Sequence, residues 1–183
     1  RAGNVAVRPD TESYMFVLKS LGFKSDANAI RTAREILQKM ETDGIRMTVG
    51  ILNQFLRVLA KSDAEGAMQE AESILQEVER GVQAGTGRVR PNEASYHVVI
   101  ERHSRQGGAT DADRLLSQMK KLSAQPGRID VRPNVVAYAA VMDAWGKSEE
   151  PGALDRVESL FEEMCQIGRP NNYVFGTYQS ALH

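Results

Sequence analysis

The three histidines and the single cysteine are the side chains of this 183-residue chain best suited to metal binding or nucleophilic catalysis. His97 and His103 are six residues apart, so they would lie on different sides of a helix. With Cys165 and scattered carboxylates they form no spacing typical of a metal site. The sequence also lacks a phosphate loop and the His-x-Glu with Cys-x-x-Cys pattern of deaminases. We therefore predict no catalysis, no metal and no cofactor in this segment.

The elements that would position functional side chains are short amphipathic helices that recur along the chain. Apolar residues at i, i+3, i+4 and i+7, followed by a small residue, indicate one face of a helix. In the first copy this frame includes Val17, and in the fourth it includes Trp145. Successive frames are spaced by 38, 44, 42 and 37 residues and begin at Tyr14, Leu52, Tyr96, Tyr138 and, in a truncated copy, Phe175.

A second amphipathic helix follows each of the four complete first helices. These second frames begin at Ala33, Ala71, Ala112 and Val157. One helix pair cannot bury both of its apolar stripes, whereas stacked pairs can share a continuous core. The sequence therefore predicts an all-α fold, a right-handed α-solenoid of helix–turn–helix repeats.

Pro-Asx pairs separate the repeats, because proline ends one repeat and the Asp or Asn can cap the next helix. These pairs are Pro9-Asp10, Pro91-Asn92, Pro133-Asn134 and Pro170-Asn171, and Met47-Thr48 replaces the pair once. We predict one array with repeats at 11–48, 49–92, 93–134 and 135–171. Residues 1–10 would end a preceding repeat and 172–183 would begin a fifth, so we expect the segment to belong to a longer protein.

These repeats resemble the pentatricopeptide repeat family. The best copy runs from Pro133-Asn134 through Tyr138 to Gly146-Lys147, and its second helix closes on Leu160-Phe161-Glu162-Glu163-Met164 and Gly168. The resemblance covers nearly the whole chain. The repeats are longer than is usual in the family, with the extra residues in connections such as 81–90 and 123–132. Tetratricopeptide repeats fit less well, because they lack the Pro-Asx pair and the aromatic residue that follows it.

The resemblance implies binding of single-stranded RNA in mitochondria or plastids, in transcript processing, stability, editing or translation. Each repeat would read one base through two residues. The implied pairs are Met15 with Thr48, Asn53 with Asn92, His97 with Asn134, and Ala139 with Asn171, and Gly176 would open a fifth. Asn53 with Asn92 is the only standard pair and would prefer a pyrimidine. Asn53 is also the best single candidate, because asparagine is a poor helix former.

The resemblance also implies residues that sandwich the base and cations that follow the phosphates. Val136 suits the sandwich position and Tyr173 could stack, whereas Ala94, Gly50 and Glu12 suit it poorly. Lys61, Arg105 and Lys147 share one slot, nine residues after the start of the frame, and Lys24 is displaced by one residue. A row of cations can track an RNA backbone.

Structural explanations compete with this RNA-binding interpretation. A cation at the end of a helix complements the helix dipole without any ligand, and an Asn after proline is a helix cap. The net charge of −1 and the pI near 6.4 exclude a strong global attraction for polyanions. No apolar run is long enough for a membrane span. The alternative function is therefore a helical scaffold that binds a protein or peptide.

Overall fold

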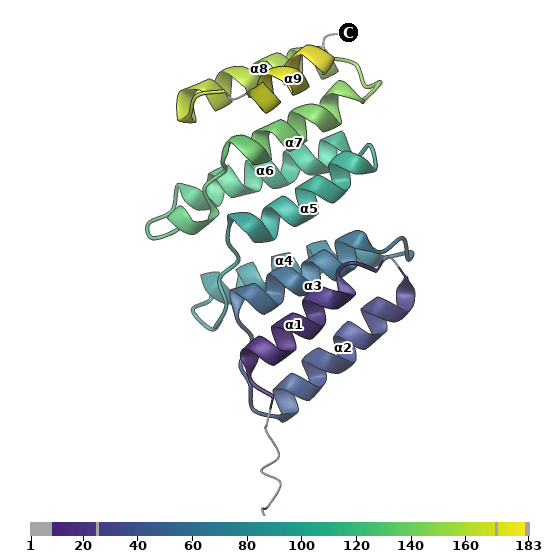
Figure 1. The fold of residues 1–183 in the computed structure, drawn as a ribbon. Coiled ribbons are helices and arrows are strands. Elements are labelled where there is room, and N and C mark those ends of the chain that lie inside the picture. Colours follow the sequence, from purple (N-terminus) through teal and green to yellow (C-terminus); the bar gives the residue numbers. More distant parts are fainter. Residues whose placement is uncertain (1–8, 25, 171, 182–183) are drawn as a thin grey trace, which may run out of the picture. The chain divides into compact units, whose positions relative to one another are not determined.

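The computed structural model describes residues 9–24, 26–170 and 172–181, with side chains for all of these except Tyr173 and Ala181. These residues form nine α-helices, one short 3-10 helix and no strand (Figure 1). The all-α prediction is therefore confirmed. Within this part of the chain, no helix has both the length and the apolar character that a membrane crossing requires.

The chain divides into two compact units, residues 1–71 and 72–183, which we call unit 1 and unit 2. The division falls inside α4 (Ala67–Gln83) and therefore within the predicted second repeat. The contacts of α4 change at this point. Glu70 pairs with Arg34 in unit 1, whereas Glu72 pairs with His103 and Arg114 in unit 2.

Helix caps explain where several helices begin. Asp10, Asn92 and Asn134 each accept a hydrogen bond from the backbone N–H three residues later, as the Pro-Asx pattern predicts. Thr48 does the same in the repeat that lacks a Pro-Asx pair. Asn171 lies outside the described residues.

Unit 1 consists of α1 (Thr11–Leu21), α2 (Ala27–Thr42), α3 (Val49–Lys61) and the start of α4. Helix α1 packs against α2 and α3, which bury its side chains Tyr14, Leu18 and Leu21. Val17 is 46% exposed, so the prediction that it belongs to the core is wrong. The physical reason is that α2 and α3, the helices that pack against α1, cover the side of α1 that carries Tyr14 and Leu18 and leave Val17 open to solvent.

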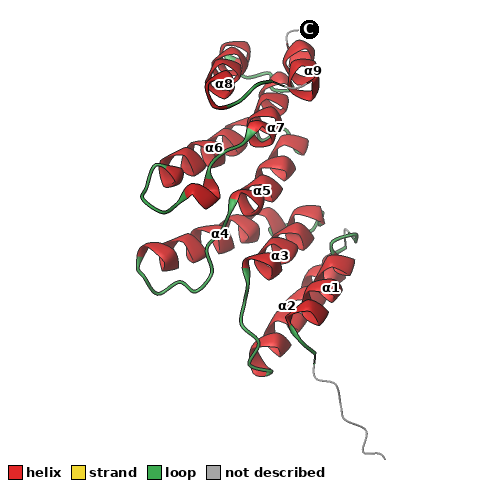
Figure 2. Cartoon of the chain, turned by 60° about the vertical axis from the view of Figure 1, so that its left-hand side comes forward, coloured by secondary structure: helices red, strands yellow, loops and turns green. Residues whose placement is uncertain are grey.

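Unit 2 continues with the rest of α4 and with five further α-helices. They are α5 (Glu93–Arg105), α6 (Ala109–Ser123), α7 (Val135–Gly146), α8 (Ala153–Ile167) and α9 (Asn172–Ala181). The 3-10 helix η1 (Ile129–Val131) interrupts the connection between α6 and α7. Within this unit α7 packs against both α5 and α9, and Figure 2 shows these first helices in one layer and α6 and α8 in the other.

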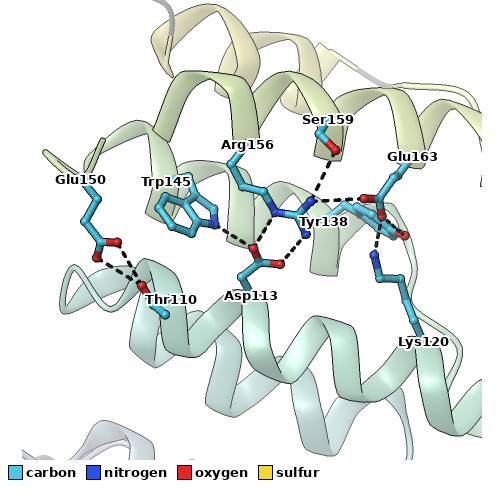
Figure 3. A network of polar contacts seen from close by, with 9 residues as sticks. All are labelled: Thr110, Asp113, Lys120, Tyr138, Trp145, Glu150, Arg156, Ser159 and Glu163. Carbon is cyan, nitrogen blue, oxygen red and sulfur yellow. Dashed lines mark hydrogen bonds and ion pairs between the residues drawn. The ribbon is translucent and has the colours of Figure 1, made fainter. Parts of the chain in front are cut away.

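A polar network joins α6, α7 and α8 in unit 2 (Figure 3). Asp113 accepts hydrogen bonds from Arg156 at 2.6 and 2.8 Å and from the indole N–H of Trp145 at 3.2 Å. Lys120 and Arg156 both pair with Glu163. Trp145 is only half-buried, so the prediction that it lies in the repeat core is wrong. Its N–H needs a polar partner, and Asp113 provides one at the margin of the core.

Candidate nucleic-acid interface

Unit 2 contains one predicted reading pair whose two members are both described and accessible. His97 is half-buried on α5, and Asn134 is exposed at the start of α7, the helix that packs beside α5. The Oδ1 atom of Asn134 accepts a hydrogen bond from Ala137 N at 2.9 Å, which leaves the amide N–H groups as donors. Capping and base reading are therefore compatible at this residue.

The Nδ1 atom of His97 is buried and has no hydrogen-bond partner in the described part of the chain. A buried ring nitrogen without a partner is uncommon in a folded protein, because its desolvation is uncompensated. A nucleobase edge can supply the missing donor or acceptor when the half-buried side chain turns toward the surface. The predicted sandwich residues next to this pair are also accessible, since Ala94 is half-buried and Val136 is 45% exposed.

The prediction that Ala139 reads a base is wrong for this structure. Ala139 is 0% exposed, so its methyl group cannot touch a ligand. The reason is that α7 packs against α5, α6, α8 and α9, which bury most of its side chains. Its predicted partner Asn171 and the side chain of Tyr173 lie outside the described residues, whereas Gly176 on α9 is exposed.

In unit 1 the predicted pair of Met15 and Thr48 is occupied by packing and capping. The Met15 sulfur lies 3.4 Å from the point where a Cβ atom on Gly50 would be, so Met15 fills the space left by this glycine. The Thr48 hydroxyl caps α3 by accepting a hydrogen bond from Ile51 N at 3.3 Å.

The members of the second predicted pair belong to different units. Asn53 is half-buried on α3 of unit 1, and Asn92 caps α5 of unit 2 by accepting a hydrogen bond from Ser95 N at 3.2 Å. Glu12 is exposed on α1.

The predicted phosphate-binding cations are all exposed. Lys61, Arg105 and Lys147 lie at the ends of first helices, whereas Lys24 lies in the turn after α1. In unit 2, Arg105 donates to Glu101 at 2.6 Å, and Lys147 donates to Asp143 at 2.6 Å. Asp143 also accepts a hydrogen bond from Ser104 Oγ at 3.1 Å, which links α7 to α5. These carboxylates were missed in the sequence, although their i,i+4 spacing to the cations is readable there. Exposed ion pairs of this kind contribute about 0.3–0.5 kcal/mol to stability. A phosphate group can therefore displace the carboxylate from the cation.

The corresponding positions in unit 1 carry the opposite charge. Glu101 and Asp143 each stand five residues after the start of their frame, and in the first two repeats Lys19 and Arg57 stand there. The slot for the phosphate-binding cation in the first repeat is occupied by Phe23, and Lys24 follows it. Among the described residues no ion pair to Lys19, Arg57 or Lys61 is found, so the last turn of α1 and the second half of α3 form a basic region within unit 1.

Among the described residues, no group of three or more His, Cys, Asp or Glu side chains is arranged to hold a metal ion. His103 is instead used structurally, because its Nε2 atom lies 2.7 Å from Glu72. Cys165 is exposed on α8. The arrangement suits recognition of a polar, anionic ligand through hydrogen bonds and charge.

Comparison with known proteins gives a structural likeness. No family model matches the sequence, and no curated protein matches it. Two crystal structures of the pentatricopeptide repeat protein PPR10, each in complex with an 18-nt psaJ RNA element, match with a TM-score of 0.72 and 19% identity. The match covers 95% of this chain and 22% of PPR10. At this identity the likeness establishes the fold: this chain has the helical-repeat fold of pentatricopeptide repeat protein PPR10.

Proposed function

We propose that this chain is a single-stranded RNA-binding module that acts by recognition, without catalysis. The observation that carries the proposal is the α5–α7 surface of unit 2. There, His97 offers a ring nitrogen without a partner, Asn134 offers an amide and Val136 offers an exposed apolar side chain. Amide and imidazole groups can discriminate base edges, and aliphatic side chains can contact base faces. The likeness to a protein crystallised with RNA supports this assignment.

Within this proposal, Arg105 and Lys147 contact phosphates, and Lys61 does so at the end of α3. Each lies at the end of a first helix and has an exposed side chain. Phosphate contacts contribute affinity without sequence information, whereas His97 and Asn53 contribute choice of base. Because few repeats carry standard reading residues, we expect this segment to discriminate bases weakly.

The test is a fluorescence-anisotropy titration of the chain with short single-stranded RNAs that differ at one base, at two salt concentrations. Replacing Lys61, Arg105 and Lys147 with alanine should weaken binding to every RNA and lower the salt slope by about 0.7 per lost contact. Asn53→Ala should change base preference at one nucleotide with little effect on the salt slope. A matched control replaces three exposed cations of second helices, namely Arg31, Arg80 and Lys121.

A second candidate function is a scaffold that binds a protein or peptide. The observation in its favour is that Glu101 and Asp143 neutralise two of the three predicted phosphate-binding cations. If the wild-type chain binds no RNA at low salt, this scaffold function is favoured. If the triple variant binds RNA as tightly as the control variant, the proposed phosphate contacts are wrong and the three cations serve only their helices.

We extend the proposal to the cellular role. The fold and the repeat pattern support a function in mitochondrial or plastid RNA metabolism. Expression of the full-length protein with a fluorescent tag, followed by sequencing of the RNA crosslinked to it, tests both points. A nuclear or cytosolic distribution would overturn the organellar assignment.

A further inference from the structure

Unit 1 contains a cleft between the C-terminal half of α1 and the middle of α3 that the repeat pattern does not explain. Its volume is about 340 Å³, and it is lined by Lys19, Gly22, Phe23, Gln54 and Arg57. This volume falls within the range of sites that bind small organic ligands. Lys19 comes from the last turn of α1, Gly22 and Phe23 follow the end of this helix, and Gln54 and Arg57 come from α3.

The charge of the cleft is positive and uncompensated. Lys19 and Arg57 both line it, no carboxylate does, and no ion pair to either cation is found among the described residues. The side chain of Arg57 lies against Gly22, with its Cδ atom 3.5 Å from the point where a Cβ atom would be. Two like charges at one cleft repel each other in the absence of an anion, so an anionic ligand would stabilise this arrangement.

One of the residues that line the cleft carries a buried hydrogen-bonding atom without a partner. The Oε1 atom of Gln54 is buried and accepts no hydrogen bond in the described part of the chain. Buried acceptors are nearly always satisfied in native proteins, so this atom indicates a missing donor. The amino or imino group of a nucleobase is such a donor when the half-buried Gln54 side chain turns toward the cleft.

An exposed aromatic ring completes the cleft. Phe23 lines it and is nevertheless 82% exposed, far more than is usual for a large apolar side chain. Cations combined with aromatic side chains are the common platform for single-stranded nucleic acid, because the cations hold phosphates and the rings stack on bases. An acidic peptide would satisfy the two cations but would leave the ring and the amide unused.

We infer that this cleft binds one nucleotide of the single-stranded RNA, with its phosphate on Lys19 and Arg57, its base on Phe23 and a base N–H donating to Gln54. This inference rests on the proposed RNA-binding function. In the first repeat, Phe23 stands at the position where the other repeats carry the predicted phosphate-binding cation. The inferred phosphate contacts, Lys19 and Arg57, stand five residues after the start of their frames. Glu101 and Asp143 occupy the equivalent positions in unit 2.

The first test measures stacking of a base on the aromatic side chain at position 23. The chain has one tryptophan, so Phe23→Trp in a Trp145→Phe background places the sole indole at the cleft. The probes are a twelve-nucleotide oligouridylate, uridine 5′-monophosphate and a decaglutamate peptide. We expect saturable quenching of the indole by the oligouridylate, with weaker quenching by the mononucleotide. Quenching by the mononucleotide without quenching by RNA, or equal effects of decaglutamate and RNA, would overturn the inference.

The second test follows affinity in chains that keep Phe23 and Trp145. Lys19→Ala with Arg57→Ala should weaken oligouridylate binding about tenfold at low salt and reduce the salt slope by about 1.4, as two lost phosphate contacts predict. The control is Arg31→Ala with Arg80→Ala, which removes the same charge from second helices. Gln54→Leu should weaken RNA binding while leaving the melting temperature equal or higher, because it removes an unsatisfied acceptor. A purely structural Gln54 would instead give a lower melting temperature with unchanged affinity.

The two levels of the proposal fail differently. If wild-type protein binds oligouridylate but the indole is not quenched and the Lys19/Arg57 variant matches its control, the cleft assignment is wrong and RNA binding stands. If wild-type protein does not bind oligouridylate at all, the proposed function and the cleft assignment are both overturned.

Discussion

Arg128 and Glu79 form a bidentate ion pair in the interior of unit 2, with N–O distances of 2.8 and 2.7 Å. The two side chains are 5% and 3% exposed. Glu79 belongs to α4, and Arg128 precedes η1 in the connection between α6 and α7. The pair therefore fastens a long connection to a helix 49 residues away, and the partners cannot be recognised from local sequence.

The first prediction is that removing either partner alone strongly lowers the free energy of unfolding. Arg128→Ala or Glu79→Gln should lower the free energy of unfolding by about 3–5 kcal/mol, because each breaks a buried charge pair. Urea denaturation followed by circular dichroism measures this. Arg128→Met with Glu79→Leu should be less destabilised than the sum of the single variants, since neither charge of the pair is left without its partner, although Asp130, which lies 3.5 Å from Arg128, loses its contact. Additive losses would show that the pair is not coupled.

The second prediction concerns Trp145, whose indole N–H donates to Asp113 at 3.2 Å. Trp145→Phe removes this hydrogen bond but keeps an aromatic ring, and should cost about 1 kcal/mol. Trp145→Ala also removes apolar contacts and should cost more, although less than the roughly 3–5 kcal/mol of a fully buried tryptophan. Both values come from urea denaturation. Equal costs for the two variants would show that ring packing contributes nothing.

The third prediction concerns alkaline pH. Burial raises the pKa of Tyr138 to about 12, with a further contribution from Glu163. The hydrogen bond to Asp43 raises the pKa of Tyr14 to about 12, and burial raises the pKa of Tyr96 further still. Between pH 10 and 12 these phenols ionise in the unfolded chain but stay protonated in the folded one, so the unfolded state loses protons first. Stability should therefore fall as pH rises through this window.

Tyrosinate absorbance at 295 nm measures this titration. We expect a late phase for these three of the five tyrosines, close to alkaline unfolding measured by circular dichroism. Glu163→Gln removes one of the causes at Tyr138 and should move part of the phase to lower pH. A single transition centred near pH 10 in the folded protein would contradict the burial and contacts of these side chains.

The fourth prediction is that the carboxylates paired with Arg105 and Lys147 restrain RNA binding. Glu101→Gln with Asp143→Asn releases both cations from their 2.6 Å contacts. Affinity for oligouridylate should rise severalfold and the salt slope should steepen, because two more cations become available for phosphates. The charge-matched control replaces Glu158 and Glu162, which are exposed on α8. An equal gain in the control would assign the effect to net charge alone.

The fifth prediction concerns the unpaired ring nitrogen of His97. His97→Ala should change base preference at one nucleotide by about 1–3 kcal/mol, if the imidazole bonds to a base edge. Anisotropy titrations with RNAs varied at single positions measure this change. His97→Phe keeps a stacking ring without the nitrogen, so it separates hydrogen bonding from stacking. Unaltered preference in both variants would remove His97 from the reading surface.

The helices and most of the core could be predicted from the amino-acid sequence alone. The reason is that apolar residues recur every three to four positions along each helix and so mark its buried face. Tyr96, Ile100 and Leu116 can therefore be assigned to the interior from the sequence. The caps Asp10 and Asn134 follow from the same local rule. Local periodicity also explains the errors at Val17 and Trp145, because it shows which side chains share a face but not how far the neighbouring helices cover it.

Which of the predicted site residues a ligand can reach depends on how the helices pack, and the sequence does not show this. Ala139 is buried because four helices pack around α7, and Met15 is engaged because it fills the space above Gly50. The buried pair of Arg128 and Glu79 and the cleft between α1 and α3 join residues distant in sequence. Their contacts depend on helix packing, and packing is fixed by the fit of whole surfaces rather than by the spacing of residues along one helix.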